Sequence, residues 1–128
     1  LSTAAMRAVL PASVPFGEAV QTSGCAALLV FSLLSGAKGA LPAALRDQLH
    51  EPYRGPKIPG FADVRAAAVA SGALATVISG SGPTLLSFVA DPSGAKAVGD
   101  AKIRAWEARG VPATAHVLPI DPSGARTL

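Results

Sequence analysis

The stretch from residue 78 to residue 84 reads Ile78-Ser79-Gly80-Ser81-Gly82-Pro83-Thr84. The segments on either side of it, residues 75–79 and 85–90, are rich in β-branched and large apolar residues, so they predict two strands joined by a tight turn. Two glycines separated by a serine and followed by Pro-Thr are more than a hairpin turn needs. Backbone with so little side-chain cover can approach a phosphate closely, and its N–H groups can form an anion-binding nest. On this pattern alone, a plain hairpin and a phosphate-facing loop both remain open.

The elements around this turn predict the fold class. Residues 61–70 predict a helix before the hairpin, and residues 94–109 predict a helix after it. Apolar and polar residues alternate over 113–118, which predicts a last strand. The order helix, strand, turn, strand, helix, strand is typical of an α+β, ferredoxin-like fold, in which an antiparallel sheet carries helices on one face.

The first sixty residues predict mostly helix. Helices are expected at 3–10, where Ser2 or Thr3 would cap the start, at 18–34 and at 41–49, whereas three prolines make 50–60 a loop. The helix over 18–34 is apolar almost all round in its second half, so we expect it to be buried at the centre. We also expect these helices to cover the same sheet face as the later ones.

Two arginines are candidates for binding a carboxylate. Arg54 closes the segment Glu51-Pro52-Tyr53-Arg54, where prolines stiffen the chain, and a guanidinium there could hold a carboxylate in a bidentate way. The alternative for Arg54 is a surface ion pair in a solvated loop. Arg7, taken alone, is a basic residue near one end of the chain.

Composition excludes several classes of protein. With 128 residues, of which 50% are hydrophobic, the chain is one ordinary domain and not a disordered segment. Its 11 Lys and Arg exceed its 8 Asp and Glu, but they are scattered, so no nucleic-acid partner is predicted. The apolar run 25–34 is too short to cross a bilayer, so no membrane partner is predicted either. The single cysteine, Cys25, fits a reducing compartment, and we expect a cytoplasmic protein.

Catalytic side chains and metal ligands are not apparent. Two histidines and one cysteine without close spacing give no metal-ligand cluster. Serines are plentiful, but no nucleophile-elbow motif surrounds any of them.

The segments together resemble the C-terminal domain of the homoserine kinase family, a branch of the galactokinase, homoserine kinase, mevalonate kinase and phosphomevalonate kinase (GHMP) superfamily. The matching segments are, in chain order, Leu1-Ser2-Thr3-Ala4-Ala5-Met6-Arg7, Val9-Leu10-Pro11, Glu51-Pro52-Tyr53-Arg54, Ile58-Pro59-Gly60-Phe61, residues 78–84 and Gly124-Ala125-Arg126. The glycine loop marks the superfamily, and the arginine-bearing segments are typical of homoserine kinases within it. The resemblance covers essentially the whole chain, so residues 1–128 are expected to be one GHMP kinase C-terminal domain.

The resemblance implies an activity and roles for named residues. The family uses ATP and Mg²⁺ to phosphorylate the hydroxyl of L-homoserine to O-phospho-L-homoserine, on the route to threonine. The arginines that match Arg7 and Arg54 bind the homoserine carboxylate in the family. The residues matching Ser79, Gly80, Ser81, Gly82 and Thr84 lie beside the ATP phosphate loop and shape the substrate pocket. No catalytic residue and no metal ligand is expected in this chain.

The chain departs from the family pattern at its start. No segment matches the superfamily's N-terminal phosphate loop, Pro-x-x-x-Gly-Leu-Gly-Ser-Ser-Ala, or its acidic Mg²⁺ ligand, and the chain begins at Leu1 rather than Met. We therefore expect the C-terminal portion of a longer enzyme, inactive alone, with the ATP and Mg²⁺ sites mainly on the N-terminal domain. Its expected partners are L-homoserine, ATP, its own N-terminal domain and, because family members are often dimers, a second copy.

Two other interpretations stay open. One is another GHMP small-molecule kinase, such as a mevalonate or diphosphocytidyl-methylerythritol kinase, which would share the glycine loop without needing both arginines. The other is a free-standing ferredoxin-like domain that binds small molecules or forms a regulatory dimer.

Overall fold

A two-stranded antiparallel hairpin forms around the glycine-rich turn, as predicted. The computed structural model describes residues 1–121, 123–124 and 126–127. In it, β1 (Ala73–Ile78) pairs with β2 (Leu85–Val89), with Ile78 opposite Leu85 and one irregularity between Ala73 and Ala75. The α+β class and the antiparallel pairing of the sheet are confirmed.

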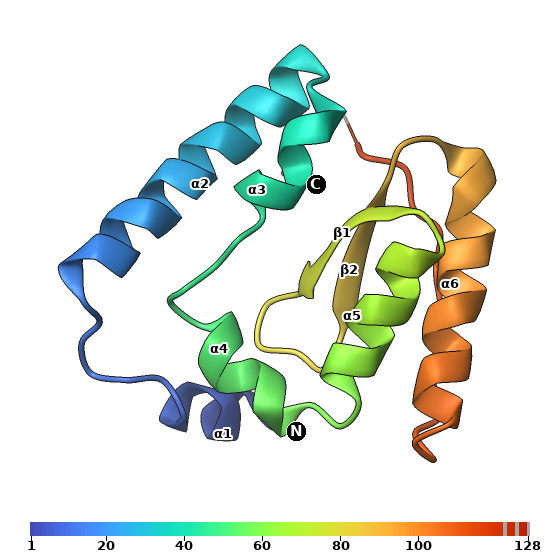
Figure 1. Ribbon diagram of the computed structural model, residues 1–128, viewed down its shortest axis with the longest axis horizontal. Helices are drawn as coiled ribbons and strands as arrows, with labels where there is room; N and C mark the ends of the chain where they lie inside the picture. Colours follow the sequence, from blue (N-terminus) through green and yellow to red (C-terminus); the bar gives the residue numbers. More distant parts are fainter. Residues whose placement is uncertain (122, 125, 128) are drawn as a thin grey trace.

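Two helices pack against each other and against this hairpin (Figure 1). They are α5 (Phe61–Ala70) and α6 (Pro92–Glu107), where helices were expected over 61–70 and 94–109. Burial of apolar side chains between the hairpin and these helices drives the association. The main buried cluster consists of Met6, Ile58, Val64, Ile78 and Leu85, and a smaller one consists of Ala68, Ala73 and Val98.

The first half of the chain lies beyond the β1 side of the hairpin (Figure 1). Its elements are α1 (Thr3–Ala8), α2 (Phe16–Ser35), the 3-10 turn η1 (Lys38–Ala40), α3 (Leu41–Ala44), α4 (Glu51–Arg54) and the 3-10 turn η2 (Gly55–Lys57). Ser2 caps α1 as predicted, because its hydroxyl accepts a hydrogen bond from the Ala5 N–H at 3.1 Å. Met6 of α1 joins the buried cluster that α5 and the hairpin form, whereas α2 packs mainly against α3 and η1, so the expectation was wrong for α2.

The prediction that the long apolar helix is buried was also wrong. α2 packs against α3 and η1, and Ser32 is its one buried residue. Phe16 and Leu34 are each 85% exposed. By length and composition alone α2 could cross a bilayer, and 6% of its most apolar 18-residue stretch is buried. An apolar composition predicts that a helix will be covered, but it does not identify which surface covers it.

Two boundaries differ from prediction because of a local cap. The helix expected over 41–49 ends at Ala44, and the loop expected over 50–60 contains α4 and η2. The Asp47 carboxylate accepts hydrogen bonds from the backbone N–H groups of His50 and Glu51, both at 2.7 Å. These bonds satisfy free N–H groups at the start of a helix, and Pro52 is tolerated in a first turn.

The expected last strand, residues 113–118, is not paired in the part of the chain that the structure describes. Residues 111–120 are irregular, and this segment runs beside α6 (Figure 1). The segment Gly124-Ala125-Arg126 is only partly described, because Ala125 lies outside the described residues.

Candidate functional site

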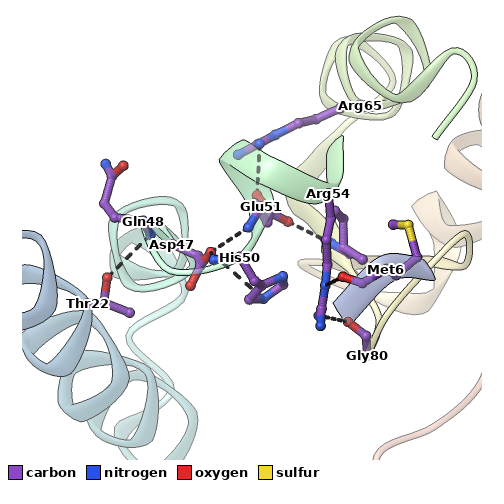
Figure 2. Close-up of polar contacts among 10 residues, drawn as sticks. Met6, Thr22, Asp47, Gln48, His50, Glu51, Arg54, Arg65 and Gly80 are labelled. Carbon is purple, nitrogen blue, oxygen red and sulfur yellow. Dashed lines mark hydrogen bonds and ion pairs between the residues drawn. The ribbon is translucent and has the colours of Figure 1, made fainter. Parts of the chain in front are cut away.

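Arg54 joins three segments that are far apart in the sequence. From α4, its Nε donates to the carbonyl oxygen of Met6 in α1 at 3.1 Å, and its Nη1 donates to the carbonyl oxygen of Gly80 at 3.0 Å (Figure 2). A guanidinium carries five N–H groups in a fixed fork, so three remain after these two bonds. Those three are enough for one further bidentate contact with a carboxylate.

The same contacts bring Arg7 to this place. Arg7 follows Met6 in α1, and its side chain is exposed, with no hydrogen bond or ion pair to another described residue. The Thr3 hydroxyl of α1 lies 3.4 Å from the Ser81 hydroxyl of the glycine loop. The structure therefore brings together α1 with Arg7, α4 with Arg54, and the loop over residues 79–84.

The glycine loop is closed by its own backbone. The Ser79 N–H donates to the Thr84 carbonyl at 2.9 Å, and the Gly82 N–H donates to the Ser79 carbonyl at 3.1 Å. Gly80 and Gly82 have φ angles of 61° and 76°, in the left-handed region that favours glycine. The Gly82–Pro83 peptide bond is cis. Because the loop is short and largely exposed, its backbone can be approached closely by a ligand.

Glu51 holds the strand that leads into this loop, a role that the sequence did not reveal. Its carboxylate is buried, with the residue 6% exposed. Oε1 accepts a hydrogen bond from the Ile78 N–H at 2.7 Å, and Oε2 forms an ion pair with Arg65 Nη1 at 3.1 Å (Figure 2). Glu51 and Arg54 are one helical turn apart, so both project from the same side of α4. A negative residue in the first turn of α4 also suits the helix dipole.

The segment before α4 adds further polar contacts. Asp47, which caps α4, lies 3.9 Å from His50 Nε2, and Thr22 of α2 accepts a hydrogen bond from the Gln48 N–H at 3.3 Å. The Nδ1 atom of His50 is buried and has no hydrogen-bond partner among the described residues. These contacts tie α2 to α4 through residues 47–50 (Figure 2).

Arg7 and Arg54 do not line either of two hollows in the described surface, whereas Ser79 and Thr84 of the glycine loop line one of them, a groove of about 530 Å³. A cavity of about 690 Å³ lies beside Glu51 and Arg65, but Arg7, Arg54 and the glycine loop do not line it. Over residues 1–121, 123–124 and 126–127, no three His, Cys, Asp or Glu side chains gather as metal ligands would. The arrangement offers guanidinium groups and glycine backbone, which suit a carboxylate and a phosphate, respectively.

Comparison with known proteins identifies relatives of the whole described fold. Residues 32–108 match the family model described as GHMP kinases C terminal. The chain is 45% identical over 124 residues to a homoserine kinase of a Synechococcus species, and 46% identical over 124 residues to one of a Picosynechococcus species. Each match covers 97% of this chain and 40% of the relative, so the chain spans about two fifths of those proteins.

A solved structure shares the fold. The crystal structure of homoserine kinase from Cytophaga hutchinsonii superposes with a TM-score of 0.82 at 33% identity. The similarity covers 84% of this chain and 34% of that one.

Proposed function

Since the chain belongs to the GHMP kinase family, we propose that it is the C-terminal, substrate-binding part of a homoserine kinase. The complete enzyme would transfer the γ-phosphoryl group of ATP to the hydroxyl of L-homoserine, giving O-phospho-L-homoserine on the route to threonine. Membership in this kinase family implies the use of ATP. The names of the relatives, which are homoserine kinases, support the choice of substrate.

The observation that carries this proposal is the position of Arg54. Its guanidinium contacts both the Met6 carbonyl beside Arg7 and the Gly80 carbonyl of the loop. A small zwitterion such as homoserine offers a carboxylate, for which a guanidinium is the best bidentate partner. Arg54 and Arg7 would hold this carboxylate while the substrate hydroxyl points toward the phosphate. In phosphoryl transfer, such positioning together with charge stabilisation supplies most of the catalysis.

The glycine loop would lie beside the ATP phosphates. Its exposed residues Ser79, Gly80 and Thr84, with Ser81 and Gly82, would shape the substrate pocket and support the phosphate loop of another domain. Mg²⁺ would be bound mainly by that domain, because the described acidic residues of this chain do not gather into a metal site.

The remaining partners follow from this proposal. The chain would act with its own N-terminal domain, with L-homoserine and ATP, and in some assemblies with a second copy. It would be inactive alone. The enzyme would be cytoplasmic, in keeping with its single cysteine.

The test is steady-state kinetics on the full-length enzyme with L-homoserine and ATP. Arg54→Ala and Arg7→Ala should each raise KM for homoserine by at least about tenfold, while KM for ATP changes little, because a charge-assisted contact contributes about 1.5–3 kcal/mol. Arg104→Ala, which removes an exposed guanidinium on α6, is the matched control and should leave both KM values unchanged. Equal effects on both substrates would contradict the carboxylate role.

A substrate panel separates the alternatives. Phosphorylation of mevalonate or of another small alcohol, with none of homoserine, would favour a different GHMP kinase. A full-length protein with no ATP-dependent phosphorylation of any panel member would favour a ligand-binding or regulatory domain.

A further inference from the structure

Three arginines line the cavity of about 690 Å³ that lies beside α4 and α5, which we call the arginine cavity. Arg46 comes from the segment before α4, Arg65 from α5, and Arg109 from the residues that follow α6. Arg7 and Arg54 do not line it, so it is separate from the proposed carboxylate site. A hollow of this size can hold a small organic molecule.

The carboxylates of the arginine cavity are already engaged by the protein. Asp47 and Glu51 each accept hydrogen bonds from backbone N–H groups, and their side chains are only 17% and 6% exposed. Asp63 is half exposed and is paired with Arg109. The side chain of Arg65 is 42% exposed and Arg46 is exposed, so the charge that solvent reaches in the cavity is mainly positive.

Arg65 is held in place before any ligand arrives. Its Cζ lies over the Phe61 ring, 5.8 Å from the ring centroid, and its Nη1 donates to Glu51 at 3.1 Å (Figure 2). The Phe61 ring packs closely on Gly55, where an added Cβ would lie 2.8 Å from the ring. The bond to Glu51 uses one of the five N–H groups of the guanidinium, so four remain. A side chain that is already ordered loses less conformational freedom when it binds a ligand.

Arg46 supplies a second guanidinium for a ligand. It forms no hydrogen bond or ion pair through its side chain with another residue that the structure describes. The neighbouring acid, Asp47, instead caps α4 through the N–H groups of His50 and Glu51. A guanidinium without a carboxylate partner can bind an oxyanion in a bidentate way.

The rest of the lining favours an organic ligand. Apolar side chains complete the arginine cavity, namely Pro52, Pro56, Ile58 and Phe61. Sites for small organic molecules combine such apolar surface with a few placed polar groups. An inorganic ion would leave this apolar surface in contact with water.

We propose that the arginine cavity binds a small organic polyanion, whose phosphate or carboxylate groups are held by Arg46, Arg65 and Arg109. This site goes beyond the proposed function, because it shares no arginine with the substrate site and needs no phosphoryl transfer.

NMR titration of the full-length protein tests the binding, with citrate as the carboxylate probe and fructose 1,6-bisphosphate as the phosphate probe. Chloride keeps the ionic strength constant. The backbone amide signals of residues 46–48 and 60–62 should shift saturably with at least one probe, and the probe that saturates them assigns the chemical class. Shifts that stay proportional to concentration for both probes would overturn the proposal. A protein that binds a probe in this way but does not phosphorylate homoserine contradicts only the proposed function.

Replacing Arg46 identifies the residues that bind the anion. Arg46→Gln should raise the Kd of the saturating probe at least about tenfold, because it removes a charge-assisted contact. Arg104→Gln changes the net charge equally, but it lies on the exposed face of α6 outside the arginine cavity, so it should leave the Kd unchanged. Equal Kd values in Arg46→Gln and the wild type would refute the site.

Replacing Asp63 should have the opposite effect. Asp63→Asn releases Arg109 from its ion pair, so the Kd should fall about two- to fivefold. Asp100→Asn also breaks a surface ion pair, with Lys96, but lies outside the arginine cavity and should not change the Kd. An unchanged or higher Kd in Asp63→Asn would exclude Arg109 from the site and contradict the proposal. A variant that merely loosened the fold would not bind the probe more tightly.

Discussion

The Glu51 carboxylate accepts a hydrogen bond from the Ile78 backbone N–H at 2.7 Å, and this bond fixes the strand end from which the glycine loop departs. One helical turn later, Arg54 donates to the Gly80 carbonyl inside the loop. The two ends of one short helix thus hold the end of β1 and the loop at positions that are two residues apart. The proposed carboxylate-binding arginine is oriented by the same contacts that shape the loop.

Replacing Glu51 should destabilise the protein strongly. Glu51→Ala leaves the Ile78 N–H buried without an acceptor, and we expect a loss of about 3 kcal/mol in the free energy of unfolding. Glu51→Gln retains an acceptor oxygen but loses the charge that pairs with Arg65, so a loss of about 1 kcal/mol is expected. Urea unfolding of both variants measures the difference.

A surface ion pair supplies the control for this prediction. Asp63 pairs with Arg109, and both side chains are about half exposed, at 49% and 57%. Asp63→Asn should change the free energy of unfolding by less than about 1 kcal/mol. If Glu51→Ala lowered the free energy of unfolding no more than Asp63→Asn does, the hydrogen bond from Ile78 to Glu51 would not stabilise the fold.

Local pattern predicted the hairpin and the helix before it, because both depend on residues close in sequence. The turn over 79–84 follows from its glycines and the β-branched residues around it, and the helix over 61–70 was expected from its sequence; the structure contains both. Arg54 was identified by its motif. Its hydrogen bond to the Met6 carbonyl was not predicted, because 48 residues separate the two. Every residue also has a backbone carbonyl, so the residue type does not identify this acceptor.

The burial of side chains against segments distant in the sequence could not be predicted in the same way. Glu51 belonged to a recognised motif, yet its burial depends on where β1 ends, and no local spacing encodes that. The apolar composition of α2 predicted burial and the alternation over 113–118 predicted pairing, and the described part of the chain supplies neither. An apolar or alternating composition indicates that a segment packs against another one. Only the tertiary structure shows whether the described chain contains that other segment.

Exchanging Arg54 for lysine should loosen the loop while keeping the positive charge. An ammonium is a compact donor and cannot match the fork that reaches the Met6 and Gly80 carbonyls together. Arg54→Lys should therefore speed amide exchange at residues 79–82 by about tenfold, which corresponds to the loss of one hydrogen bond. Arg104→Lys on the exposed face of α6 is the matched control. Unchanged loop exchange in Arg54→Lys would show that the charge alone holds the loop.

The two glycines of the loop should differ in their tolerance of alanine. Both have positive φ, so either substitution carries a backbone cost of about 1 kcal/mol. A Cβ at Gly80 meets nothing within 4 Å, whereas a Cβ at Gly82 would lie 2.7 Å from Ile58 Cδ1 in the core. Overpacking adds about 1–3 kcal/mol, so Gly82→Ala should cost about 3 kcal/mol in total. Thermal unfolding of the two variants compares them, and equal costs would contradict the contact with Ile58.

The start of α6 should give the protein a pH-dependent contribution to stability. Asp91 caps this helix by accepting from the Ser93 N–H at 2.9 Å, and it also accepts from the Ser93 hydroxyl. The hydrogen bonds from Ser93 lower the pKa of Asp91 below its usual 3.8, and the charge of Lys38 lowers it slightly further.

Because the folded state favours the carboxylate, the stabilisation by Asp91 is complete above pH 3.8 and is lost as the pH falls through the lower pKa of the folded protein. Asp91→Ala should therefore have a lower Tm than the wild type at pH 7, and the two Tm values should converge in strong acid. Asp121→Ala, which removes an exposed carboxylate outside α6, should show no such convergence. The charged cap would be excluded as the source if the difference in Tm between wild type and Asp91→Ala stayed constant from pH 7 to pH values well below 3.8.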